Sequence, residues 1–362
     1  MSYIKYYVYK KQQQVNGQWV DVYPAETKPD GYPLGTYDTL AECQGFVPPT
    51  GTTKFRAVYG GGTTYEIPCD GNTTLTSGDT QPTGYTASAM TSAEIGSCVT
   101  SIGEEAFYTC SGLTSCIIPD SVTSIGKKAF SYCFHLQRIN SDVDGVFNIP
   151  NTVTSIGNRA FNWCFELSNI KIPSGVTSIS DYTFNNCTSL TSVTIPENVT
   201  SIGEFAFASC SGLTSIIIPD SVTSIGDAAF ADCSGLTSCT IGSGVTTIGS
   251  VAFSNCTSLS SITIPSSVTI IDGWAFKGCS SLTSVTIPSG VEYIWFGAFK
   301  DCSGLTSITC LASQPPTLLY WEEEGNIFEN TGNCPIYVQA ASLSQYQASD
   351  GWSNYSDRLV GF

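Results

Sequence analysis

The chain has 362 residues, which is enough for one long repeat domain with small flanking units. Its 14 Lys and Arg face 30 Asp and Glu, and this net charge of −16 argues against a nucleic-acid partner, which would need a basic face. The sequence has no apolar run long enough to cross a bilayer, and it therefore predicts no membrane span.

The N-terminal residues predict a small β-rich domain over residues 1–70, because strand-like stretches alternate there with turn residues. Met1–Lys10 alternates like a strand and lacks the apolar core of a signal peptide. Two explanations stay open: an export signal was removed or replaced, or the protein does not use that route. A disulfide between Cys43 and Cys69 is one option within this domain. Residues 71–93 are rich in Thr, Gly and Ser and predict a linker.

A repeat occupies the middle of the chain. Nine phenylalanines each lie three residues before a cysteine, and the step between them is 23 residues, with a single step of 31. A fixed period of this length predicts a stack of supersecondary units that bury their apolar faces against one another. The pairs are Phe107–Cys110, Phe130–Cys133, Phe161–Cys164, Phe184–Cys187, Phe207–Cys210, Phe230–Cys233, Phe253–Cys256, Phe276–Cys279 and Phe299–Cys302.

Each coil of the repeat predicts two short strands and one tight turn. In a representative coil, Leu190–Ile195 ends in an apolar alternation that is typical of a strand with one wet face. Pro196 marks a corner, and Val199–Ile202 predicts a second extended piece. Gly203 permits a bend, and Glu204–Cys210 predicts a short helical or 3-10 turn that points Phe207 inward.

The pattern L-x-x-[IV]-x-I-P-x-x-V-x-x-I-G-x-x-A-F-x-x-C resembles the BspA-like class of bacterial leucine-rich repeats. The resemblance covers Ile95 to about Cys310, and it implies a curved, right-handed leucine-rich-repeat solenoid that is mainly β. It also implies a cell-surface or secreted adhesion role without catalytic residues. We therefore expect nine coils over residues 94–310 and a C-terminal cap over residues 311–362, which closes the exposed end of the core.

The 16 cysteines predict buried thiols more than disulfides or metal ligands. Cysteines that repeat in parallel, one coil apart, have Cβ atoms nearly 5 Å apart, whereas a disulfide needs about 3.8 Å and converging side chains. No C-x-x-C motif occurs, and we expect no metal and no cofactor. The cysteines outside the repeat register are Cys43, Cys69, Cys98 and Cys334.

An enzyme of the Ser-His-Asp or Cys-His type would have to use His135, because it is the single histidine. Its coil position predicts a solvated turn outside the core, while the neighbouring Cys133 belongs to the inward-facing cysteines. A regular rod also offers no cleft for a pair of catalytic carboxylates. The sequence therefore predicts a protein that is not an enzyme.

Two adjacent coils depart from the small residues that the repeat uses elsewhere, and they flank the extra eight residues around 141–148. Aromatic residues and Arg beside a loop insertion are typical of an interaction hot spot. The alternative is that the aromatic side chains pack beneath the inserted loop. The insertion also holds Asp142-x-Asp144-Gly, a fragment of a calcium loop without the rest of the motif. The candidate partner-binding residues are Lys128, Tyr132, Phe134, His135, Arg138, Arg159, Trp163 and Phe165.

Two further rows are weaker candidates. Tyr182, Phe205 and Trp274 recur at one coil position and are either a contact strip or scattered surface aromatics. A row of threonines along the predicted strand face has two interpretations. Thr favours strands and suits a solvent-exposed face, and such a row of hydroxyl groups also suits ice or sugar binding. Its members are Thr194, Thr240, Thr263, Thr286 and Thr309.

The sequence as a whole favours an extracellular or surface-exposed bacterial solenoid that binds a host or bacterial surface protein or a glycan. The rival hypothesis is a structural virion component, such as a tail or fibre protein, in which residues 1–70 are the attachment unit. The β-rich start and the missing export signal favour this rival.

Overall fold

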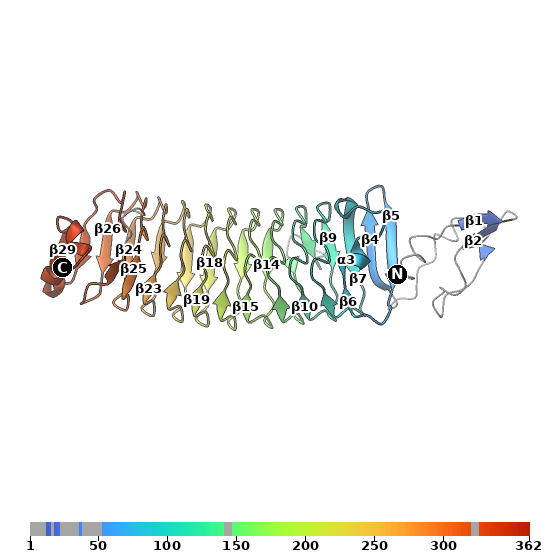
Figure 1. Ribbon diagram of the computed structural model, residues 1–362, viewed down its shortest axis with the longest axis horizontal. Helices are drawn as coiled ribbons and strands as arrows, with labels where there is room; N and C mark the ends of the chain where they lie inside the picture. The colour runs from blue at the N-terminus through green and yellow to red at the C-terminus, as the bar shows by residue number, and fades with distance from the viewer. Residues whose placement is uncertain (1–11, 16–17, 22–35, 38–52, 141–146, 320–325) are drawn as a thin grey trace.

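The computed structural model describes residues 12–15, 18–21, 36–37, 53–140, 147–319 and 326–362. From residue 53 onwards, the described residues wind into a β-solenoid, a long rod with β5 (Thr63–Pro68) at one end and β29 (Leu359–Gly361) at the other (Figure 1). Three short strands precede the rod and form an antiparallel sheet of their own: β1 (Gln12–Val15), β2 (Gln18–Asp21) and β3 (Thr36–Tyr37).

Each coil contributes two strands, as expected, and the strands of successive coils pair in parallel and in register. The longer strand of each coil precedes the proline corner. These strands are β7 (Met90–Ile95), β9 (Ser115–Ile117), β11 (Arg138–Ile139), β12 (Phe147–Asn148), β14 (Asn169–Lys171), β16 (Ser192–Thr194), β18 (Ser215–Ile218), β20 (Ser238–Ile241), β22 (Ser261–Thr263), β24 (Ser284–Ile287), β26 (Ser307–Cys310), β28 (Ile336–Val338) and β29.

The shorter strand of each coil follows the corner, and these strands form ladders of four and seven members. The stack therefore has at least eleven coils, more than the nine that the Phe and Cys pairs predict. The strands are β6 (Thr74–Leu75), β8 (Ser101–Ile102), β10 (Ser124–Ile125), β13 (Ser155–Ile156), β15 (Ser178–Ile179), β17 (Ser201–Ile202), β19 (Ser224–Ile225), β21 (Thr247–Ile248), β23 (Ile270–Ile271), β25 (Tyr293–Trp295) and β27 (Thr317–Leu319).

The third side of each coil is a chain of turns and not the helical or 3-10 turn that the sequence predicts. Every second N–H along it bonds to the next coil, as Phe205 N does to Asp227 O at 2.8 Å and Phe207 N to Ala229 O at 2.8 Å. The residues two before and two after each core Phe adopt positive φ, for example 52° at Phe205 and 57° at Ser209. Left-handed residues at these places end any helix, and the bonds to the next coil hold them there.

The core phenylalanines form one continuous column. Ten rings, from Phe107 to Phe328, follow one another with centroids 4.8–5.8 Å apart and planes within 18°. Most of these spacings are slightly wider than the roughly 4.8 Å between paired strands. The rod nevertheless shows little of the expected curvature in Figure 1.

The repeat cysteines are buried free thiols, as expected, and each bonds to the coil before it. From Cys133 to Cys302, each Sγ donates to the carbonyl oxygen of the core Phe one coil earlier at 3.0–3.3 Å. A thiol is small enough for this tight position and still offers a weak donor. Burial raises the pKa of the Cys233 thiol to about 12.

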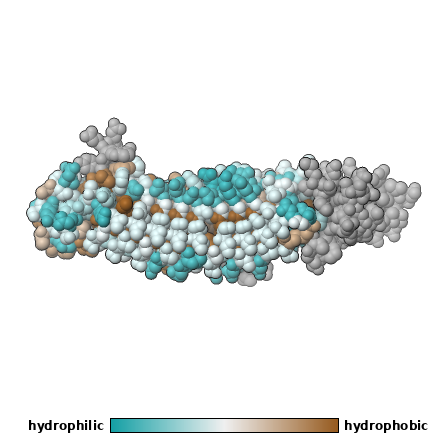
Figure 2. All heavy atoms as spheres, turned by 60° about the horizontal axis from the view of Figure 1, so that its bottom comes forward, coloured by the Kyte–Doolittle hydropathy of each residue, from teal (hydrophilic) through white to brown (hydrophobic). Residues whose placement is uncertain are grey.

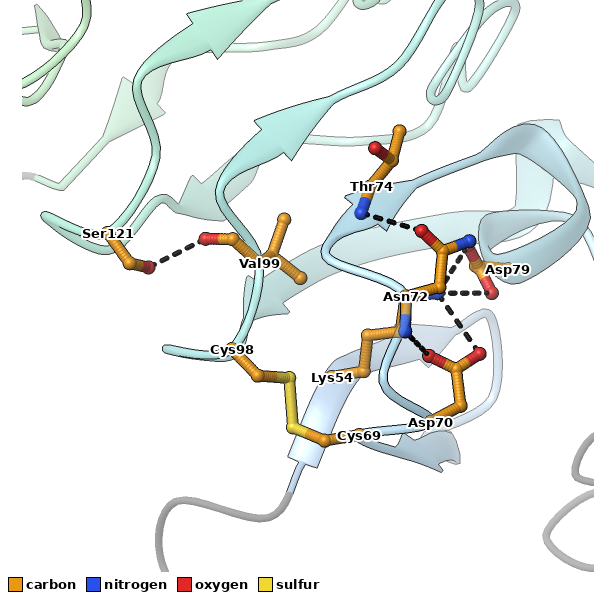
Figure 3. Close-up of a disulfide and its surroundings, with 9 residues drawn as sticks. All are labelled: Lys54, Cys69, Asp70, Asn72, Thr74, Asp79, Cys98, Val99 and Ser121. Carbon is orange, nitrogen blue, oxygen red and sulfur yellow. Dashed lines mark hydrogen bonds and ion pairs between the residues drawn. A yellow bond between two sulfur atoms is a disulfide. The ribbon is translucent and has the colours of Figure 1, made fainter.

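The N-terminal end of the rod is closed by a hairpin of β4 (Thr53–Tyr59) and β5, in which β4 pairs antiparallel with β7. The Phe55 ring lies 5.8 Å from that of Phe107 and covers the end of the column. Lys54 is 1% exposed, and its ammonium lies 3.4 Å from Asp70 and 3.2 Å from Asp79 (Figure 3). The two carboxylates compensate for the cost of burying this cation.

Two sequence predictions fail at this end. Cys69 bonds to Cys98 and not to Cys43, which lies outside the described residues (Figure 3). The expected linker over 71–93 instead holds β6, the short helix α3 (Ser77–Thr80), the 3-10 turn η2 (Ala87–Ala89) and the start of β7. The corners of the coils are themselves rich in Thr, Ser and Gly, so composition did not distinguish a coil from a linker.

The C-terminal cap follows β28 and consists of η3 (Ala340–Ser342), α4 (Leu343–Ala348), η4 (Trp352–Tyr355) and β29. The rings of Trp352 and Tyr355 lie 5.9 and 5.2 Å from that of Phe328. Trp352 Nε1 donates to Pro316 O at 2.7 Å, so its one polar atom is satisfied inside the core. Much of the rod surface in Figure 2 is pale, with a narrow apolar band along its length.

Phe230→Ala is expected to lower the free energy of unfolding by about 3–5 kcal/mol, because it removes a fully buried ring from the middle of the column. Ile217→Ala is the control, since Ile217 is 68% exposed, and it should change stability by less than about 0.5 kcal/mol. Urea denaturation followed by circular dichroism measures both. Equal losses for the two variants would contradict the column.

The 13 free cysteines of the described residues are expected to resist a thiol reagent in the folded protein at about pH 8, since all of them are buried and out of the reagent's reach. The absorbance released when a chromogenic disulfide reagent reacts, measured with and without guanidinium, gives the number of reactive thiols in the unfolded and folded protein. Rapid native labelling of several thiols, confirmed by peptide mapping, would show that the cysteine positions are open to solvent.

Candidate functional site

The extra eight residues leave the stack in the middle of a strand. Ile139 pairs with Cys116 of the preceding coil, and Phe147 pairs with Ile170 of the following one, so both occupy the same position of the repeat. The Asn140 amide then bonds to the N and O of Ile118 at 2.7 and 2.6 Å, as a paired strand would. Residues 141–146, with the calcium-loop fragment, lie outside the described residues.

Six of the eight candidate residues gather on the turn side of the rod. Lys128 and Arg159 lie two residues before a core Phe, and Tyr132 and Trp163 lie two residues after one. All four have φ between 55° and 64°. Their side chains are half-buried, outside the core column. Phe134 and Phe165 follow on the same side and complete the group.

The other two candidates lie apart from this group. Arg138 is exposed on strand β11. His135 is 57% exposed, and its Nδ1 lies 2.6 Å from a Glu166 carboxylate oxygen. Gln137 also donates to Glu166, and hydrogen bonds from Gln137 and from His135 lower the pKa of that carboxyl. The Cys133 thiol is buried and directed to Phe107 O, so it is no nucleophile for His135.

The aromatic side chains contact one another across neighbouring coils. The rings of Tyr132 and Trp163 stack at 5.9 Å, and those of Phe134 and Phe165 stack at 5.2 Å. Trp163 meets Phe165 edge to face at 5.4 Å, and this contact joins the two stacks. The aromatic cluster therefore packs within itself. The inserted loop, beneath which the alternative interpretation packs these side chains, lies at 141–146, outside the described residues.

A shallow depression of about 270 Å³ runs along the turn side beside this cluster. One wall consists of the residues two before each core Phe, the other of the residues two after it, and the floor of the residues directly after it. We call this depression the turn groove. Its wall residues are Lys128, Arg159 and Tyr182 on one side and Tyr132 and Trp163 on the other, and its floor residues are Tyr108, Ser131, Asn162 and Asn185.

A second depression of about 340 Å³ lies on the other side of Tyr132. Ala87, Ser88, Thr109, Ser111, Tyr132 and Phe134 line it.

The floor of the turn groove escaped the sequence prediction. Ser131, Asn162 and Asn185 are small or polar residues of an ordinary kind. The helical turn that the sequence predicts would not place them between two rows of larger side chains, as the observed turns do. The signal that could have found them is periodic: they directly follow the core Phe in the same coils that carry the large wall residues.

The two cations of the groove, Lys128 and Arg159, differ in whether a described carboxylate pairs with them. Lys128 Nζ lies 2.6 Å from Glu105, and this hydrogen bond is the main reason why the pKa of Lys128 is raised. The Arg159 guanidinium lies 4.5 Å from the centroid of the Tyr182 ring. Within the described ranges it forms no ion pair with a carboxylate.

The remaining sequence candidates separate into two types. Tyr182 stacks on Phe205 at 4.7 Å, and Trp274 meets Phe296 edge to face at 4.5 Å, so these aromatics form local pairs and no continuous strip. The row of threonines lies on the exposed strand face, where Thr240 pairs with Thr263 and Thr286 with Thr309. The described residues hold no group of three or more potential metal ligands, and none of their helices is long and apolar enough for a membrane span.

Trp163→Asn is expected to lower the free energy of unfolding by only about 1 kcal/mol. The change removes two ring contacts, each contributing about 0.5–1.5 kcal/mol, but Asn tolerates positive φ better than Trp does. Asn186 occupies the equivalent position one coil later. Urea denaturation checks the value, and a loss as large as that of Phe230→Ala would place Trp163 in the core.

The repeat region matches the family described as BspA type leucine rich repeat region over residues 82–146, 145–250 and 202–316. No curated protein matches the chain. Among solved structures, a leucine-rich repeat protein from Bacteroides ovatus is 25% identical, with 84% of this chain and 90% of that chain covered and a TM-score of 0.48. A leucine rich cell surface protein from Faecalibacterium prausnitzii is 27% identical, with the same coverage and a TM-score of 0.41. The pneumococcal vaccine antigen PcpA is 14% identical, with 97% of both chains covered and a TM-score of 0.42. Because the matched ranges together span well over half of the 362 residues, the chain belongs to the BspA-type leucine-rich repeat family.

Proposed function

We propose that this protein is a cell-surface or secreted bacterial binding protein that holds a protein or glycan partner in the turn groove and catalyses no reaction. The observation that carries the proposal is the change of residue size along one wall. The residues two after the core Phe are Tyr132 and Trp163 at the groove, whereas the next coils have Asn186 and Ser209.

The stack does not need these large side chains. Its stability comes from the buried columns and from the hydrogen bonds between coils, and the coils with Asn186 and Ser209 make the same bonds. Half-buried aromatic residues beside Arg are the composition that dominates binding energy in protein interfaces. The aromatic cluster is therefore best explained as a contact surface.

The disulfide supports a location outside the cytoplasm. Cys69–Cys98 ties the end of the N-terminal hairpin, just after β5, to the segment that follows β7, and disulfides persist in oxidising compartments. The free thiols of the described residues are compatible with the same compartment because they are buried in the core.

The double variant Arg159→Ala/Trp163→Ala is expected to lose binding to a partner found in a screen of surface proteins, matrix proteins and glycans. Loss of two hot-spot residues weakens an interface by at least about tenfold. The matched control is Lys171→Ala/Ile217→Ala, which removes one cation and one large apolar side chain from the exposed strand face. Biolayer interferometry measures affinity, and thermal unfolding confirms that both variants fold. Greater loss in the control would move the binding surface to the strand face.

A further inference from the structure

We infer that the turn groove binds an oligosaccharide that carries carboxylate or sulfate groups, with Arg159 as the residue that receives the anionic group. This inference rests on the proposed function, because it assigns a class of ligand to the same groove.

The floor presents a fixed row of polar side chains. Asn185 Nδ2 donates to Asn162 Oδ1 at 2.9 Å, and Asn162 Nδ2 donates to Ser131 Oγ at 3.3 Å. The row is ordered from coil to coil, and Ser131 and Asn162 are buried within it. The half-buried Asn185 stands at its end, and its Oδ1 accepts no hydrogen bond from a described residue. This oxygen is available to accept a hydrogen bond from a hydroxyl group of the ligand.

The main-chain N–H groups at four wall positions are already bonded within the stack. Lys128 N and Arg159 N donate to Asn158 O and Asp181 O of the next coil at 2.9 Å, and Tyr132 N and Trp163 N do the same at 2.8 Å. A peptide that adds to a sheet edge needs such donors free. A sugar ring uses side chains instead: its C–H face lies against an aromatic ring, and its hydroxyls bond to amides.

The anionic group follows from the state of the two cations. Lys128 is already held by Glu105 at 2.6 Å, whereas the Arg159 guanidinium lies 4.5 Å from the centroid of the Tyr182 ring and pairs with no carboxylate of the described residues. A guanidinium binds carboxylate and sulfate oxygens through two parallel N–H groups. Because the chain carries a net charge of −16, an anionic ligand is repelled by most of the surface and is attracted where a cation remains unneutralised.

The test titrates the full chain calorimetrically with three hexasaccharides, one neutral (maltohexaose), one carboxylated (oligogalacturonate) and one sulfated (heparin-derived). A hexaglutamate peptide is the fourth probe. We expect one or both anionic sugars to bind at least about tenfold more tightly than the neutral sugar and the peptide. Whichever of the two binds more tightly identifies the anionic group.

Arg159→Gln should weaken that binding by about tenfold or more, and Arg159→Lys by less, because it keeps the charge and loses the two-pronged geometry. Lys171→Gln is the matched control, since it removes the same charge from the strand face one coil away, and it should change affinity by less than about twofold.

Three results would overturn the inference: equal affinity for neutral and anionic sugars, equal losses for Arg159→Gln and Lys171→Gln, or binding of hexaglutamate without binding of either anionic sugar. The proposed function fails separately. If none of the sugars binds but Arg159→Ala/Trp163→Ala still abolishes binding of a partner from the screen, the turn groove is a binding site and only the saccharide assignment is wrong.

Discussion

The hydrogen bonds between the turn segments of successive coils determine both the stack and its surface. Every second N–H of each turn segment bonds to the coil that follows, and the residues on either side of the core Phe adopt left-handed conformations to allow it. Left-handed conformations are costly for residues with a Cβ, and a bond on each coil keeps them in place. The Phe column and the thiol bonds depend on the same register, since a shift of one residue would turn the rings outward.

The same constraint produces a surface that tolerates almost any side chain. The left-handed positions carry residues as different as Glu105, Val251 and Trp274, although a β-branched residue is the least suited to positive φ. Their side chains lie outside the core column, so residue identity there is free to serve recognition. The turn groove lies where this freedom is used most, and it is the structural basis for proposing a binding role.

The sequence predicted the parts of the fold that depend on periodicity. The Phe and Cys columns, the two strands per coil and the buried thiols all follow from side chains that recur at one spacing, and the structure confirms them. The coils without that signature were missed. Thr331 replaces the cysteine after Phe328, and Leu75 marks a first coil that has no core Phe. The Cys69–Cys98 pairing needs the three-dimensional path of the hairpin, which no local pattern contains.

For the candidate site, the sequence predicted the residues more accurately than their arrangement. Large side chains in two small-residue coils pointed to Tyr132, Trp163 and Arg159, which the groove brings together. Arg138 is also a large residue at a position where the repeat is usually small, but it lies exposed on strand β11 and does not line the turn groove. The sequence does not show which residues beside the core Phe form the floor of the groove and which form its walls. That is decided by the positive φ of the residues two before and two after the Phe.

One junction between coils lacks the pairing of its short strands. The ladder of short strands is interrupted between β13 and β15, where the Ser180 hydroxyl bonds to Ile156 O at 2.8 Å. The Phe161 and Phe184 rings on either side are 5.7 Å apart, the widest spacing among the nine repeats. Arg159 and Tyr182 sit astride this joint. The turn-side hydrogen bonds across this joint remain, from Arg159 N to Asp181 O and from Phe161 N to Thr183 O, both at 2.9 Å. The groove therefore spans a junction that main-chain bonds on its own side hold together, although the short strands on another side of the coil do not pair there.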